Sequence, residues 1–70
     1  MLELDLREME PPQPMIEIMA ALEGMAPGAE LVALLPRKPV YLLPHLEGKV
    51  RSYTLEEKAE DCWELRLIKG

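Results

Sequence analysis

The sequence has few of the residues on which most small-protein chemistries depend. Among 70 residues there are one cysteine, one histidine, one tryptophan, two tyrosines and no phenylalanine. A single thiol, Cys62, cannot form an internal disulfide, which fits a reducing compartment. His45 has no companion histidine or second cysteine at ligand spacing, and metal sites ordinarily need three or four ligands. Tyr41, Tyr53 and Trp63 are too few and too scattered to stack on successive bases.

Long apolar runs are also missing. The longest unbroken one, Leu31 to Leu35, is far short of the roughly 20 residues that cross a bilayer. Charged side chains interrupt the first eight residues, which therefore do not resemble the apolar stretch of a signal peptide. We expect a cytoplasmic protein that does not associate with membranes.

The sequence also lacks a concentration of positive charge. Its formal net charge is −5, and its eight basic residues are spread along the chain. Arg37 and Lys38 form the only adjacent basic pair. A phosphate backbone repels such a surface unless the basic residues gather in one place. We expect no binding to nucleic acid, and the acidity serves solubility.

Motifs of catalysis and cofactor binding are not recognisable. The sequence contains no glycine-rich phosphate loop, no nucleophile next to a base and no paired-carboxylate site. We therefore expect neither enzymatic activity nor a cofactor.

Hydrophobic patterns predict six elements of secondary structure. Leucines at 2, 4 and 6 alternate with Glu3 and Asp5, which is typical of a strand with one buried face. Met15, Ile18 and Met19 recur at helical spacing. We therefore interpret these methionines and Met25 as residues that fill gaps in the core, in preference to a soft-metal or partner-binding surface. The expected elements are a strand over 2–6, a helix from 14 that ends at 24–28, a strand over 30–35, a short helix over 44–48, and strands over 50–58 and 62–69.

This order of elements, β-α-β-α-β-β, predicts an α/β two-layer sandwich. The first two strands flank a helix and should be parallel with a right-handed crossover, and the continuous apolar strand 30–35 should be central. The last two strands are joined by a short polar connection and should form an antiparallel hairpin. We expect one domain, residues 1–70, with a mixed four-stranded sheet and both helices on one face.

Three prolines, Pro11, Pro12 and Pro14, stand between the first strand and the first helix. The first four amides of a helix have no partner inside it, so proline is tolerated there and fixes a sharp corner. The amino terminus of a helix also carries free amides and a partial positive charge, which suit an anion or a thiolate.

The segment "LDLREMEPPQPM" resembles the signature of the TusA/SirA-like sulfur-carrier family, in which Leu-Asp-x-Arg-Gly-Leu is followed by x-Cys-Pro-x-Pro. Asp5, Arg7, Pro12 and Pro14 match that signature, and the resemblance extends more weakly to the closing hairpin. It implies the same β-α-β-α-β-β sandwich. Pro11 stands where the carriers have the cysteine that bears a persulfide, and a glutamate stands where they have glycine. The chain therefore looks like the cysteine-less, uncharacterised branch of the superfamily.

These observations favour a non-enzymatic binding or adaptor module, a monomer or weak homo-oligomer. Its partner is an unidentified protein or a small anion held at the mouth of the first helix. An alternative is a sulfur-relay protein that uses Cys62 as a displaced carrier, and a weaker one is nucleic-acid binding by analogy of fold. The candidate ligand-binding residues are Asp5, Arg7, Met9, Glu10, Pro12, Pro14 and Met15.

Overall fold

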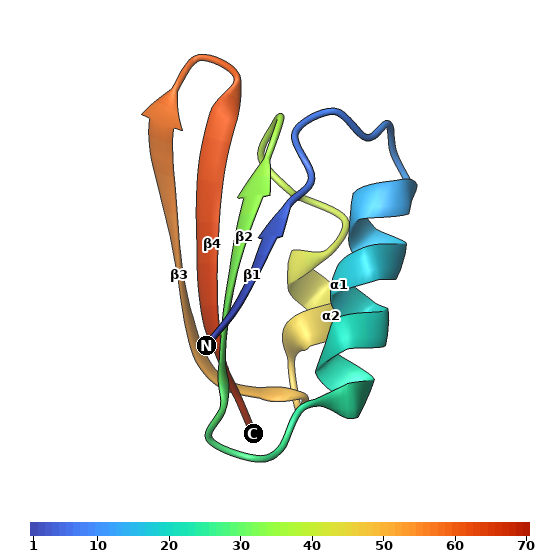
Figure 1. Cartoon of the computed structure of the whole chain (residues 1–70), viewed down its shortest axis with the longest axis vertical. Coiled ribbons are helices and arrows are strands. Elements are labelled where there is room, and N and C mark those ends of the chain that lie inside the picture. Colours follow the sequence, from blue (N-terminus) through green and yellow to red (C-terminus); the bar gives the residue numbers. More distant parts are fainter.

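Four strands form one mixed sheet, and two helices cover one of its faces (Figure 1). The computed structural model describes all 70 residues. The strand order is β1-β2-β4-β3, with β1 parallel to β2 and the other two pairs antiparallel. The predicted sandwich and central strand are confirmed. The elements are β1 (Leu2–Asp5), α1 (Gln13–Gly24), β2 (Glu30–Leu35), α2 (Leu43–Leu46), β3 (Val50–Ala59) and β4 (Cys62–Lys69).

The strand register places the apolar residues of the two central strands on the face that the helices cover. Leu31 of β2 lies between Leu2 and Leu67, and Ala33 lies between Leu4 and Leu65. Side chains alternate along each strand, so these positions share one face. The buried core also includes side chains from both helices and the segments beside them: Leu6, Ile18, Leu22, Leu35, Leu42 and Leu46.

The methionines of α1 fill the margin of this core. Met15, Met19 and Met25 are partly buried and pack against it, as their spacing predicts. Met9, in the turn before α1, packs there too, although it was predicted as a ligand-binding residue. An unbranched side chain reaches the core from an irregular segment more easily than a branched one.

Both helices begin one residue earlier than expected. The Gln13 amide donates to the Glu10 carbonyl at 2.9 Å, and the Ile16 amide donates to the Pro12 carbonyl at 3.2 Å. The preference against helical angles before a proline is therefore overridden at Gln13. The short helix α2 likewise begins at Leu43 and ends at Leu46. Neither helix is long and apolar enough to cross a membrane.

A tight turn returns the chain from α1 to the central strand. The Ala29 amide donates to the Ala26 carbonyl at 3.0 Å, and Gly28 between them has φ of 89°. Proline at the second position and glycine with positive φ at the third are typical of a type II turn. The Pro-Gly pair at 27–28 is thus a turn signal that the structure confirms.

Candidate functional site

The parallel pairing of β1 and β2 brings two loops together at one end of the sheet. Both strands end at the same edge, so the loop into α1 and the loop into α2 must lie side by side there. In Figure 1 this is the upper end of the molecule, where the hairpin between β3 and β4 also turns. Between the two loops lies a cavity of about 430 Å³. Its volume falls in the range of about 300–1,000 Å³ that is usual for ligand pockets.

The walls of this cavity, which we call the proline groove, are almost entirely apolar. Residues before and within α1 form one wall, and the loop that follows β2 forms the other. Val40 and Tyr41 are well exposed, at 53% and 83%. The lining consists of Pro11, Pro12, Pro14, Met15, Ile18, Leu35, Pro36, Arg37, Lys38, Pro39, Val40, Tyr41 and Leu42.

The amino terminus of α1 offers the groove only one free amide. Prolines at 11, 12 and 14 have no N–H to donate. The amides of Gln13 and Ile16 are already bonded to backbone carbonyls, whereas the Met15 amide makes no hydrogen bond. No side chain caps this end of the helix, and its first turn carries no acidic residue. An anion held by helix amides alone would therefore find a single donor here.

Arg37 and Lys38 are the only charged residues that line the proline groove. Both are exposed, and neither forms an ion pair. The ion pairs of the molecule engage other cations: Arg7, Lys58 and Arg66. The groove therefore combines apolar walls with two cations that are free to meet carboxylates of a ligand.

Asp5 and Arg7 form a closed pair beside the end of β1. The Nε and Nη2 atoms of Arg7 donate to the two carboxylate oxygens of Asp5 at 2.9 and 2.8 Å, and the Arg7 amide donates to the same side chain at 3.2 Å. The side-chain hydrogen bonds from Arg7 lower the pKa of Asp5 to about 2, and the same bonds raise the pKa of Arg7. The pair holds the turn after β1 and does not line the groove.

Cys62 begins β4 at this same end of the sheet. It is half-buried, and its neighbour Trp63 pairs with Leu35 at the end of β2. The strand order and the pairing of Trp63 with Leu35 place Cys62 at the end of the sheet where β1 and β2 also end.

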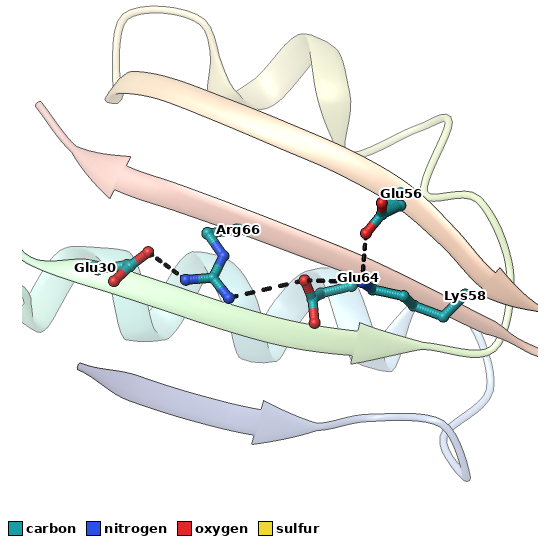
Figure 2. A network of polar contacts seen from close by, with 5 residues as sticks. All are labelled: Glu30, Glu56, Lys58, Glu64 and Arg66. Carbon is teal, nitrogen blue, oxygen red and sulfur yellow. Dashed lines mark hydrogen bonds and ion pairs between the residues drawn. The ribbon is translucent and has the colours of Figure 1, made fainter.

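The face of the sheet opposite the helices carries a row of alternating charges (Figure 2). Arg66 contacts Glu30 at 2.9 Å and Glu64 at 3.9 Å, and Lys58 contacts Glu64 at 4.0 Å and also bonds to Glu56. The bond to Lys58 lowers the pKa of Glu56 and raises the pKa of Lys58. Exposed pairs of this kind contribute little to stability. Because acids neutralise both cations, this face is a poor match for a phosphate backbone.

Three of the predicted ligand-binding residues, Pro12, Pro14 and Met15, line the proline groove. The Asp5–Arg7 pair lies outside it, Met9 packs against the core, and Glu10 is exposed and accepts the Gln13 amide through its backbone carbonyl.

The second wall, residues 35–42, was not predicted from the sequence. Two signals point to it: the only adjacent basic pair follows β2, and a parallel β1–β2 pair places that loop beside the mouth of α1.

The fold is an α/β sandwich similar to that of a SirA-like protein. A SirA-like protein from Desulfitobacterium hafniense superposes with a TM-score of 0.82 at 23% identity, over 100% of this chain and 99% of that one. Residues 3–69 match the model of a family described as an uncharacterized conserved protein, DUF2249, and the chain belongs to that family. The predicted resemblance is therefore confirmed. No curated protein matches the sequence.

Proposed function

We propose that the protein is a non-enzymatic adaptor that binds a protein partner through the proline groove. The observation that carries this proposal is the groove itself, an open apolar cavity at the position where the family signature implies a sulfur-bearing cysteine and this chain has Pro11. A protein that keeps the docking surface but has proline in place of the nucleophilic cysteine can still bind a partner, although it cannot carry sulfur at this position.

The lining of the groove supports binding more than catalysis. Tyr41, Arg37 and Lys38 are its only polar side chains, and none of the three is paired with a carboxylate or an imidazole that would activate it. A hydroxyl or amine nucleophile is usually activated by an adjacent base or by a neighbour that lowers its pKa. The exposed side chains of Val40 and Tyr41 offer apolar surface that a partner would bury.

Affinity capture from a cytosolic extract with matched variants tests this proposal. The groove variant carries Val40→Asp and Tyr41→Ala, both at exposed positions where folding tolerates the change. The control carries Ser52→Asp and Thr54→Ala, exposed positions of the edge strand β3. We expect a protein that is retained by the native chain and the control but released by the groove variant. If the groove variant retains every protein that the control retains, the groove is not the docking surface.

A sulfur-relay role for Cys62 is the second candidate, and the position of this thiol at the same end of the sheet as the turn before α1 is the observation that favours it. Incubation with a cysteine desulfurase and cysteine, followed by mass spectrometry, tests this candidate. Gain of one sulfur atom on Cys62 supports it, and an unchanged mass rejects it.

A further inference from the structure

The proline groove has a charge pattern as well as a shape, and the pattern restricts its occupant. Resting on the adaptor function proposed above, we infer that the groove takes a peptide segment of the partner in which apolar side chains stand next to acidic ones. The apolar side chains would lie against Met15 and Val40. The carboxylates would lie at Arg37 and Lys38.

The charges on the rest of the molecule favour the proline groove over other surfaces as the site for an acidic segment. The chain carries a net charge of −5, so an acidic segment is repelled from most of the surface. Arg37 and Lys38 are adjacent, exposed and unpaired, and both line the proline groove. The cations of the open sheet face, Lys58 and Arg66, are already neutralised by glutamates. The proline groove therefore matches both properties of an acidic, apolar segment.

The prolines of the groove argue against a small polar anion as the occupant. Five of the thirteen lining residues are proline and contribute no N–H. The Met15 amide is the one free donor in the first turn of α1. A small anion that has no apolar part would thus rely on one amide and two solvent-exposed side chains, which are screened by salt. A peptide gains affinity from burying apolar surface and uses the charges mainly for orientation.

Selection from a displayed library of random decapeptides tests the occupant. The native chain, the charge-reversed variant Arg37→Glu/Lys38→Glu and the control Lys49→Glu/Arg51→Glu are immobilised in parallel. Lys49 and Arg51 form an equally exposed, unpaired basic set away from the proline groove. The groove variant Val40→Asp/Tyr41→Ala identifies peptides that depend on the groove.

We expect peptides with leucine, isoleucine, methionine or phenylalanine beside aspartate or glutamate to be enriched on the native chain and on the control. Replacing both Arg37 and Lys38 with glutamine should weaken a selected peptide by roughly 2- to 30-fold at low salt, as expected for two exposed ion pairs. Charge reversal should shift the selection toward lysine and arginine.

Two outcomes overturn the inference. Groove-dependent peptides without acidic enrichment show that the occupant has another chemistry, while the adaptor function stands. Failure to enrich any groove-dependent peptide rejects a linear segment as the occupant. The adaptor function is then decided separately by the capture experiment, because a folded partner can dock on the groove without an isolated peptide doing so.

Discussion

The Nζ atom of Lys69, the last residue of β4, donates a hydrogen bond of 2.6 Å to the carbonyl of Leu22 in the last turn of α1. The carbonyls at the end of a helix have no partner inside it, and a cation there also meets the negative end of the helix dipole. This bond joins the carboxyl-terminal strand to the first helix. No basic residue of α1 itself occupies its last turn.

Replacing Lys69 with methionine, which keeps most of the aliphatic stem, should lower the free energy of unfolding by about 0.5–2 kcal/mol. Urea denaturation measures this change. Lys49→Met is the matched control, because Lys49 lines the same hollow beside α1 without a hydrogen bond from its side chain. Equal stabilities of the two variants would show that the Lys69 bond contributes nothing.

The Asp5–Arg7 pair predicts a pH dependence. The pKa of Asp5 is about 2 in the folded chain against an ordinary value of 3.8, because the carboxylate accepts hydrogen bonds from Arg7. A lowered pKa means that the pair stabilises the fold above about pH 4 and that this stabilisation is lost as the pH falls toward 2. Both side chains are exposed, so the effect on stability is small and decreases with salt.

Carbon-detected NMR titration of the Asp5 carboxylate measures this directly. The midpoint should lie near pH 2 in the native chain and should move toward 3.8 in Arg7→Gln. Arg51→Gln, which removes an unpaired cation, should leave it in place. A native midpoint near 3.8 would mean that the hydrogen bonds between the Arg7 and Asp5 side chains are not formed in solution.

The sequence predicted the buried faces of the strands, the parallel β1–β2 pair and the β3–β4 hairpin because each depends on local patterns, whereas the β2–β4 pairing was not predicted. Alternation at 2–6, the continuous run at 30–35 and the short connection near 60 determine which faces are buried and which strands pair. The helix α1 begins one residue earlier than predicted. A residue before proline, such as Gln13, prefers extended backbone angles, but here the Gln13 amide donates to the Glu10 carbonyl.

The candidate site was only half predictable. The first wall of the proline groove follows from the family signature around Pro12 and Pro14, whereas the second wall comes from a loop some 25 residues later. The adjacent basic pair alone does not mark the PRKPVYL segment as part of a cavity, since its role depends on the parallel pairing of β1 and β2. The position of Cys62 at this end of the molecule likewise depends on the sheet order, which brings the start of β4 to the end of β2.

Pro14 should contribute to stability through the unfolded chain. It occupies the first turn of α1, where its fixed φ suits the helix and its missing N–H costs nothing. Replacement with alanine should lower the melting temperature by about 2–8 °C, from roughly 0.4–1 kcal/mol in a domain of this size. The far-ultraviolet circular dichroism spectrum should be unchanged. A melting temperature equal to or above that of the native chain would show that the proline adds no stability.

Restoring a thiol at position 11 tests the placement of this turn at the mouth of α1. Pro11 is exposed and lines the groove two residues before the helix begins. A cysteine there lies close to the positive end of the helix dipole and to the free Met15 amide, which favour the thiolate. In a Cys62→Ser background, Pro11→Cys should therefore titrate below the ordinary thiol value of about 8.5.

The rate of alkylation by iodoacetamide as a function of pH measures that titration. The native chain, which carries only the half-buried Cys62, is the comparison and should react more slowly at neutral pH because access to its thiol is restricted. An engineered thiol that titrates like a free cysteine, or that resists alkylation, would show that position 11 is not held at an open helix mouth. The proline groove would then have a different shape in solution, and the adaptor proposal that depends on it would fail with it.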